Sequence, residues 1–227
     1  TTARYDLVIG CDGIRSATRS LAGIELETRS MGMGIWRAFT PRPASVTRTD
    51  LYYGGLSYIA GYCPTGADSL YCYIVEPYED RAGLTAEQGL AIMREKSQAY
   101  HGPWDDIRAV LTDPSTVNYT KFETHVLPAP WHRGRVVVIG DAAHVCPPTL
   151  AQGAAMAFED AAVLAELLLA HDQVDDALWQ ALMDRRHSRV TTVVEASNQL
   201  AQWLLDHVPG DVPGLVGRTT AMLTVPA

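Results

Sequence analysis

The sequence lacks the features that mark several large classes of protein. No apolar run is long enough to cross a bilayer, so we expect no transmembrane segment. Lys and Arg number 18 against 26 Asp and Glu, the net charge is −8, and no basic cluster occurs, which argues against a nucleic-acid partner. Because 47% of the residues are hydrophobic, the chain is expected to fold as a globular protein.

Cysteine is sparse and scattered. The four Cys residues show no CxxC or CxxH spacing, so neither a zinc site nor a dithiol redox pair is expected, and no metal is predicted. Scattered cysteines in a chain of 227 residues fit a reducing compartment, and we predict a cytoplasmic protein.

The most informative stretch is residues 134–169. It opens with Val136 to Ile139, a β-branched run typical of a buried strand, and Gly140-Asp141 follow at the carboxyl end of that strand. After a proline-bearing loop, a helix starts with Gly153 to Ala155, whose small side chains leave the free backbone N–H groups open to an anion or a polar carbonyl. A carboxylate beside such amides suits a ligand with a sugar-like arm and an electron-poor polar ring.

A second pattern lies near the start of the chain. Tyr5 to Ile9 predicts a short buried strand, closed by Gly10-Cys11-Asp12-Gly13 before a helix begins. Gly13 permits a tight turn in which Asp12 caps that helix. For Arg15, Ser16 and Arg19 we expect ion pairs and capping rather than a direct part in catalysis.

Together the two stretches resemble the DG and GD fingerprints of the FAD-dependent aromatic hydroxylases, the group A flavoprotein monooxygenases related to p-hydroxybenzoate and salicylate hydroxylase. Their order and their separation, about 130 residues (Asp141 minus Asp12), also resemble that family. The resemblance implies that Asp141 binds the ribityl chain of FAD and that the amides of residues 153–155 face the flavin pyrimidine edge. The cofactor-binding residues that it implies are Asp12, Gly13, Gly140, Asp141, Pro148, Gln152, Gly153, Ala154 and Ala155. Two residues depart from the family, because Ala151 replaces a common glycine and Ala155 an asparagine that touches the flavin in several members.

The resemblance also implies the fold, an α/β chain with an α+β insert. It comprises a partial FAD-binding Rossmann-like domain, an inserted mixed or antiparallel β-sheet substrate domain, and C-terminal helices. The expected bounds are 1–29 and 126–227 for the FAD-binding parts and 30–125 for the insert.

Within the insert, alternating apolar residues and turn composition predict a sheet with two helices. Residues 64–69 are a turn by composition, which makes the flanking strands an antiparallel hairpin. The expected strands are residues 33–40, 50–53, 57–63, 70–76 and 116–126, and the expected helices are 85–100 and 104–111.

Tyrosine is concentrated in this insert, where eight of the ten tyrosines lie between Tyr52 and Tyr100. A period of two places Tyr71 and Tyr73 on one sheet face, and Tyr58 and Tyr62 on one face of the neighbouring strand. A wall of tyrosines suits a pocket for a flat polar ring, and these four are predicted to contact the substrate. The alternative is that strands simply favour tyrosine.

The C-terminal part is predicted to be helical. The helix after Gln152 is apolar nearly all round and should be largely buried, and residues 177–206 form one long helix or two in series. The simplest interpretation of Arg185-Arg186-His187 is a solvated face, and that of His144 a structural hydrogen-bonding residue rather than a general base. The last helix could carry a homodimer contact.

The function implied by the resemblance is hydroxylation of a small aromatic or heteroaromatic substrate. NADH or NADPH would reduce the flavin, and O2 would then give a flavin hydroperoxide that an electron-rich ring attacks. No catalytic base is assigned. The alternatives are a flavin halogenase or reductase on the same scaffold, although the halogenase W-x-W-x-I-P segment does not occur, or a non-catalytic module that binds flavin or an aromatic ligand.

A final absence bears on this function. No GxGxxG follows a strand, and the chain begins at Thr1 without an initiator methionine. In the family that glycine-rich segment seats the ADP half of FAD. We therefore expect a fragment of a longer enzyme that binds FAD weakly and is inactive alone.

Overall fold

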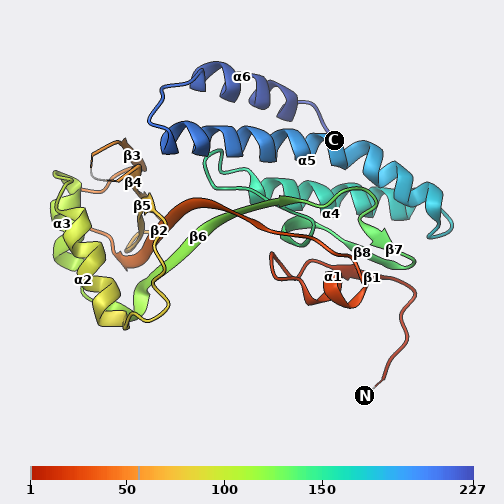
Figure 1. Cartoon of the computed structure of the whole chain (residues 1–227), viewed down its shortest axis with the longest axis horizontal. Coiled ribbons are helices and arrows are strands. Elements are labelled where there is room, and N and C mark those ends of the chain that lie inside the picture. Colours follow the sequence, from red (N-terminus) through yellow and green to blue (C-terminus); the bar gives the residue numbers. More distant parts are fainter. Residues whose placement is uncertain (1, 56) are drawn as a thin grey trace. The chain divides into compact units, whose positions relative to one another are not determined.

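The computed structural model describes residues 2–55 and 57–227 (Figure 1). They form two compact units, which we call the discontinuous unit (up to Met31, together with Glu123–Ala227) and the inserted unit (Gly32–Phe122). The sequence placed these bounds at 29/30 and 125/126.

The discontinuous unit is a small sheet with long helices. In the sheet β1 runs parallel to β8, with Val8 opposite Val136, and β7 runs antiparallel to β8. Helices normally cover the faces of a sheet that contains parallel strands. In this unit, residues of α4 and α5 supply much of the buried core. The elements are β1 (Val8–Gly10), α1 (Ala17–Leu21), β7 (His132–Arg133), β8 (Val136–Val138), a 3-10 helix (Gly140–Ala142), β9 (His144–Val145), α4 (Gly153–Ala170), α5 (Asp176–Leu205) and α6 (Val212–Leu223).

The core of this unit is apolar and aromatic. Trp131 and Val138 are fully buried, and so are Leu178 and Val190 of α5. The N-cap of α5 is Asp175, whose carboxylate accepts hydrogen bonds from the N–H groups of Ala177 and Leu178. The region predicted as one long helix or two in series is thus a single helix of 30 residues.

The inserted unit is an antiparallel sheet with two helices. The predicted hairpin is confirmed, because β4 and β5 pair antiparallel with Cys63 opposite Tyr71. The strand order β3-β4-β5-β2-β6 continues to β9, which pairs with the end of β6 that belongs to the discontinuous unit (His125 opposite Val145). The elements are β2 (Arg29–Pro41), β3 (Asp50–Tyr53), β4 (Ile59–Pro64), β5 (Ser69–Pro77), α2 (Ala86–Ser97), α3 (Pro103–Val110), a 3-10 helix (Pro114–Thr116) and β6 (Val117–Val126).

One face of this sheet is closed by α2 and α3. Trp36 and Cys72 from the strands are buried with Trp104 of α3. Thr85 and Gln88 form a capping box at the start of α2, which satisfies backbone donors at that end. The opposite sheet face carries Arg37, Phe39 and Tyr71, because successive side chains of a strand alternate between faces.

Two expectations of burial from the sequence are wrong. The first strand, expected to be buried over residues 5–9, is β1 (Val8–Gly10), in which Val8 is 38% and Ile9 43% exposed. The helix after Gln152, α4, is not largely buried, because Phe158 is 77% exposed and Leu169 is 90% exposed. Its covered side packs against α5 and the Gly140–Ala142 turn, and Met156, Val163 and Leu164 are buried. An apolar composition does not say how much of a helix has a neighbour.

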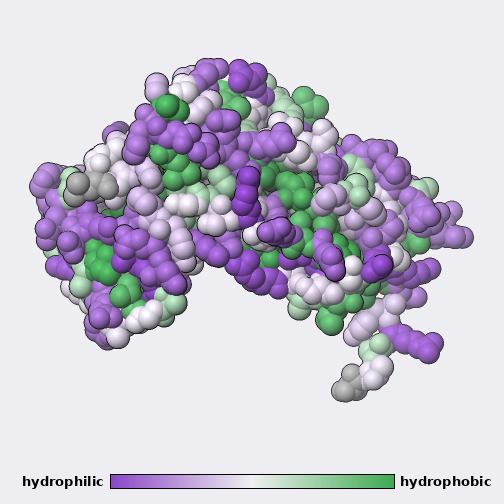
Figure 2. Space-filling view, viewed as in Figure 1, coloured by the Kyte–Doolittle hydropathy of each residue, from purple (hydrophilic) through white to green (hydrophobic). Residues whose placement is uncertain are grey.

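The surface in Figure 2 shows hydrophilic and hydrophobic residues interspersed over α5 and α6. Within the described part of the chain, no helix combines the length and apolar character that a bilayer span requires.

Candidate functional site

The candidate site begins where β8 ends. Gly140 has a φ of +59°, in the left-handed region that favours glycine. A Cβ there would lie 3.1 Å from the Cβ of Ala157, so glycine also lets the turn lie close against α4. The N–H of Gly140 donates a 2.9 Å hydrogen bond to Oδ2 of Asp160. The turn is therefore anchored to α4, the helix that follows it in the sequence.

Asp141 presents its carboxylate to the outside of this turn. The residue is exposed, and its backbone carbonyl accepts a 3.2 Å hydrogen bond from Nε2 of His125. Among residues 2–55 and 57–227, no group donates a hydrogen bond to the Asp141 carboxylate. The acceptor oxygens are thus available to a ligand, and hydroxyl groups are suitable donors.

The start of α4 offers a second polar surface. Gln152 occupies the N-cap without a side-chain hydrogen bond, and the first turn holds no acidic residue. Ala154 and Ala155 are exposed, so nothing of their own side chains covers the free N–H groups. An α-helix of 18 residues carries partial positive charge at this end, which favours an anionic or carbonyl oxygen.

The loop between these two features has an unusual backbone. Ala151 has a φ of +53°, a conformation that alanine adopts at a cost and glycine adopts freely. This accounts for the glycine that many members of the resembling family have here. Pro148 is exposed, and its carbonyl accepts a hydrogen bond from the N–H of Ala151.

The first fingerprint serves as a helix cap. The Asp12 carboxylate accepts hydrogen bonds from Ser16 Oγ (2.5 Å) and from the N–H of Thr18 (2.9 Å), and these bonds lower the pKa of Asp12 to about 2. Gly13 has a φ of +83°, which the tight turn requires. The Asp12 carboxylate is therefore engaged within the protein, at the start of α1.

Arg19 connects the first fingerprint to the second. It is buried, and its guanidinium donates a 2.6 Å hydrogen bond to the carbonyl of Ala142, directly after the Gly140-Asp141 turn. Arg15 forms a partly exposed ion pair with Glu123 at 2.7 Å. The expected ion pair is confirmed for Arg15, and the expected cap for Ser16, whose Oγ accepts a hydrogen bond from the N–H of Arg19 at the start of α1, whereas Arg19 itself donates to backbone carbonyls.

A buried charge network beneath the turn was not foreseen. Asp160 is fully buried, and its carboxylate lies 2.6 Å from Nε2 of His144 and 2.8 Å from Nε of Arg186. Burial raises the pKa of Asp160, but the hydrogen bonds from His144, Gly140 and Arg186 outweigh it, so the pKa is lowered and the carboxylate is ionised. The solvated face predicted for residues 185–187 is wrong at Arg186, which is fully buried and also pairs with Glu159 at 2.5 Å.

His125 is a further residue that the sequence did not single out. Its Nδ1 lies 2.9 Å from the hydroxyl of Thr28, and its Nε2 donates to the Asp141 carbonyl. Burial lowers the pKa of His125 to about 4. A neutral imidazole therefore holds the backbone at Asp141, and only the fold, not sequence spacing, brings the two together.

The four predicted substrate tyrosines do not form one wall. Tyr71 and Tyr73 lie on one face of β5, with ring centroids 5.4 Å apart. Tyr62 is paired with Cys72 and so lies on the opposite face, where it is buried beside Trp104 and donates a 2.9 Å hydrogen bond to Asp50. Tyr58 precedes β4, and its N–H bonds to the carbonyl of Val75.

Comparison with known proteins identifies relatives of this chain. A 6-hydroxynicotinate 3-monooxygenase of Pseudomonas fluorescens is 36% identical over 210 residues, covering 85% of this chain and 53% of that protein. A 2-heptyl-3-hydroxy-4(1H)-quinolone synthase of Pseudomonas aeruginosa is 31% identical over 209 residues, covering 87% of this chain and 52% of that protein. The chain spans about half the length of these two relatives.

Solved structures show the same fold. Klebsiella pneumoniae HpxO complexed with FAD and uric acid superimposes with a TM-score of 0.77, covering 96% of this chain and 55% of that chain at 23% sequence identity. The family model for an FAD binding domain matches residues 1–197. The chain therefore belongs to the FAD binding domain family, as predicted, and FAD is its cofactor.

Proposed function

We propose that this chain is part of a flavin-dependent monooxygenase that hydroxylates a small aromatic or heteroaromatic molecule with NAD(P)H and O2. The observation that carries the proposal is the exposed Asp141 carboxylate beside the uncapped, side-chain-free start of α4. Relatives named as a hydroxynicotinate monooxygenase and a quinolone synthase support the reaction class.

The residues present fit the flavin half of FAD. The Asp141 oxygens can accept hydrogen bonds from ribityl hydroxyls, and the amides of Gly153 to Ala155 can donate to the pyrimidine oxygens. A Cβ added to Gly153 would meet only Cys146 Sγ among the described residues, at 3.9 Å, so no side chain crowds the helix start. Bound FAD supplies the oxygen-activating chemistry.

The protein would supply electrostatics and rigidity. The α4 N-terminus favours negative charge at the flavin edge without a basic side chain. Asp160 and His125 hold the two sides of the Gly140-Asp141 turn, through the Gly140 N–H and the Asp141 carbonyl respectively. The ligand-facing groups are thus positioned before a ligand arrives.

Tyr58, Tyr62, Tyr71 and Tyr73 remain proposals for substrate contact. The sheet face of Tyr71 and Tyr73 supports the proposal best, because α2 and α3 cover the face on which Tyr62 lies. Cytoplasmic location and a homodimer contact through the C-terminal helices are also proposals. The four free cysteines support a cytoplasmic location, because the cytoplasm is reducing. Size-exclusion chromatography with light scattering tests the homodimer.

The test of the function uses the native protein that contains this chain. Its visible spectrum should show bound flavin, and phenols or hydroxypyridines should stimulate NAD(P)H oxidation with formation of a hydroxylated product. Dependence on halide would instead favour a halogenase. Absence of bound flavin would contradict the proposal and favour a non-catalytic binding module.

A further inference from the structure

The buried charges beneath the Gly140-Asp141 turn continue into α5. One oxygen of Asp160 accepts the Gly140 N–H, and the other accepts a 2.8 Å hydrogen bond from Nε of Arg186. Arg186 in turn pairs with Glu159 at 2.5 Å. Each side chain thus shares a partner with the next one, and the turn is the first member of a longer series of contacts.

Arg189, which follows Arg186 on the next turn of α5, extends this series to α6. Its Nε and Nη2 donate to the two oxygens of Glu159 at 2.8 Å and 2.6 Å, the bidentate geometry of a strong arginine–carboxylate pair. The same guanidinium donates to the carbonyls of Met222 (2.9 Å) and Leu223 (3.2 Å), at the end of α6. We call the side chains of Asp160, Arg186, Glu159 and Arg189 the connecting network.

The last turn of α6 depends on a donor from another element. The final carbonyls of a helix have no intrahelical partner and carry partial negative charge. The last turn of α6 has no basic residue of its own, so Arg189 of α5 supplies the cation. Because Arg189 is buried, solvent screens this contact little.

Little else holds α6 in place. Among the described residues of α6, Thr219 alone is buried, while Met222 and Leu223 pack half-buried against the apolar core. A helix with so little buried surface can open while the rest of the protein stays folded. Docked and open α6 are therefore two states, and the contacts of Arg189 favour the docked one.

Opening of α6 has consequences at the other end of the network. Arg189 then loses two acceptors and is free to move, and Glu159 loses a partner of fixed geometry. Asp160 and Arg186 are fully buried, so their positions depend on hydrogen bonds within the network rather than on water. A contiguous network of this kind can carry coupling from a two-state element to a distant site.

We propose that docking of α6 strengthens FAD binding, because the connecting network holds the Gly140-Asp141 turn most rigidly while α6 is docked. By thermodynamic linkage, bound FAD favours docked α6 by the same factor. Glu159, Arg186 and Arg189 are positioning residues that act through Asp160. This inference rests on the proposed function in placing FAD against Asp141.

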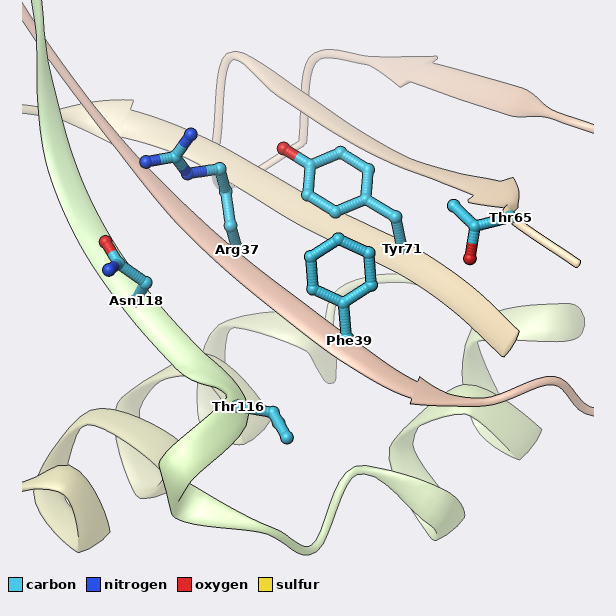
Figure 3. Close-up of a pocket in the computed structure, with 6 residues that line it drawn as sticks. All are labelled: Arg37, Phe39, Thr65, Tyr71, Thr116 and Asn118. Carbon is cyan, nitrogen blue, oxygen red and sulfur yellow. The ribbon is translucent and has the colours of Figure 1, made fainter. Parts of the chain in front are cut away.

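The network is distinct from the pocket of the inserted unit. Figure 3 shows that pocket, with Arg37, Phe39 and Tyr71 among the side chains that line it. None of the four network residues lines the pocket. The effect of the network on FAD affinity can therefore be measured without a ligand in this pocket.

The test uses the native protein that contains this chain, with and without FAD. Hydrogen exchange of the α6 backbone amides reports docking, and flavin fluorescence gives the FAD dissociation constant. In the wild type we expect FAD to slow α6 exchange by about fivefold or more, as for a typical coupling between two sites. Exchange in α2 is the internal reference and should be slowed less, because α2 belongs to the inserted unit and contains no member of the network.

Arg189→Gln should remove the effect of FAD on α6 exchange and raise the FAD dissociation constant by a comparable factor. Arg189→Lys keeps the charge without the bidentate fork, so it should restore part of both effects. Arg218→Gln is the matched control, because Arg218 is an exposed arginine of α6 that pairs with Asp211 outside the network. It should leave exchange and affinity unchanged.

Circular dichroism establishes that each variant is folded. If Arg189→Gln does not fold, Met222→Ala replaces it, because it removes an apolar contact of α6 with the core and keeps every charged side chain and the residue 222 carbonyl. This variant should also weaken FAD binding, since it shifts α6 toward the open state.

Three results would overturn the inference and leave the proposed function intact. They are α6 exchange that does not respond to bound FAD, equal slowing in α2 and α6, and wild-type FAD affinity in the folded Arg189→Gln or Met222→Ala variant. A wild-type protein that binds no FAD would instead refute both the inference and the proposed function.

Discussion

The clearest prediction concerns Asp160, which joins α4, α5 and the Gly140-Asp141 turn. Its carboxylate is fully buried and accepts from three groups: the Gly140 N–H at 2.9 Å, His144 Nε2 at 2.6 Å and Arg186 Nε at 2.8 Å. Asp160→Ala would leave a buried guanidinium with one counter-charge fewer and a buried N–H with no acceptor.

The magnitude follows from these contacts. Removing one partner of a buried ion pair destabilises a protein by roughly 3–5 kcal/mol, a value that includes the groups left unpaired. Arg186 keeps its 2.5 Å contact with Glu159 and its bond to the Met156 carbonyl, which places the expected loss near the lower end, at about 3 kcal/mol. That is a large fraction of a total stability on the order of 5–15 kcal/mol.

Urea unfolding followed by far-ultraviolet circular dichroism measures the loss. Glu166→Ala is the control, since Glu166 is 63% exposed in its pair with Arg185 and such surface pairs contribute about 0–1 kcal/mol. The low pKa of Asp160 adds a pH signature. Its stabilisation is present above the ordinary carboxyl pKa of 3.8 and is lost as the pH falls through the lower folded-state value. A loss below about 1 kcal/mol in Asp160→Ala would refute this account of the network.

Three further predictions follow from the same region. Asp141→Ala in the native protein should weaken FAD retention, measured by flavin release on dilution. The control is Asp172→Ala, at another exposed aspartate, which should leave retention unchanged. Equal retention in the two variants would contradict the role of Asp141. Ala151→Gly should raise the free energy of unfolding by about 0.5–1 kcal/mol and the melting temperature by a few degrees, because glycine adopts the φ of +53° at residue 151 without strain. A lower melting temperature would count against backbone strain at this residue. Because burial lowers the pKa of His125 from 6.5 to about 4, the unfolded chain binds the extra proton between these values. Stability should fall by up to ~3 kcal/mol as the pH drops from 6.5 toward 4, and His125→Gln should flatten that part of the profile; an unchanged slope would refute it.

Local features were predictable from the sequence because short-range chemistry determines them. The Thr85 and Gln88 capping box, the turn at residues 64–69 and the glycine at position 13 each depend on neighbours within a few residues. The fingerprint at Gly140-Asp141 was predictable for the same reason, because the turn follows directly from the strand that precedes it.

Contacts between elements that are distant in the sequence could not be predicted. Arg186 lies in a run of polar residues that looks solvated, but α5 brings it against Asp160, 26 positions earlier. The burial of Tyr62 depends on α3, and the partnership of His125 with the Asp141 carbonyl depends on how β6 and the turn meet. In each case a polar or aromatic residue acquires its environment from a segment whose position no local pattern specifies.

The entry and exit of the inserted unit have a practical consequence. Residue 32 lies in β2 and residue 122 in β6, and these two strands are hydrogen-bonded neighbours in the sheet. Because the unit is entered and left through neighbouring strands, its two ends lie close together. The DNA segment that encodes it can therefore be exchanged between homologous genes, or expressed as a separate polypeptide, without long linkers. Chimeras joined at these two points would show whether ligand preference travels with the transplanted piece.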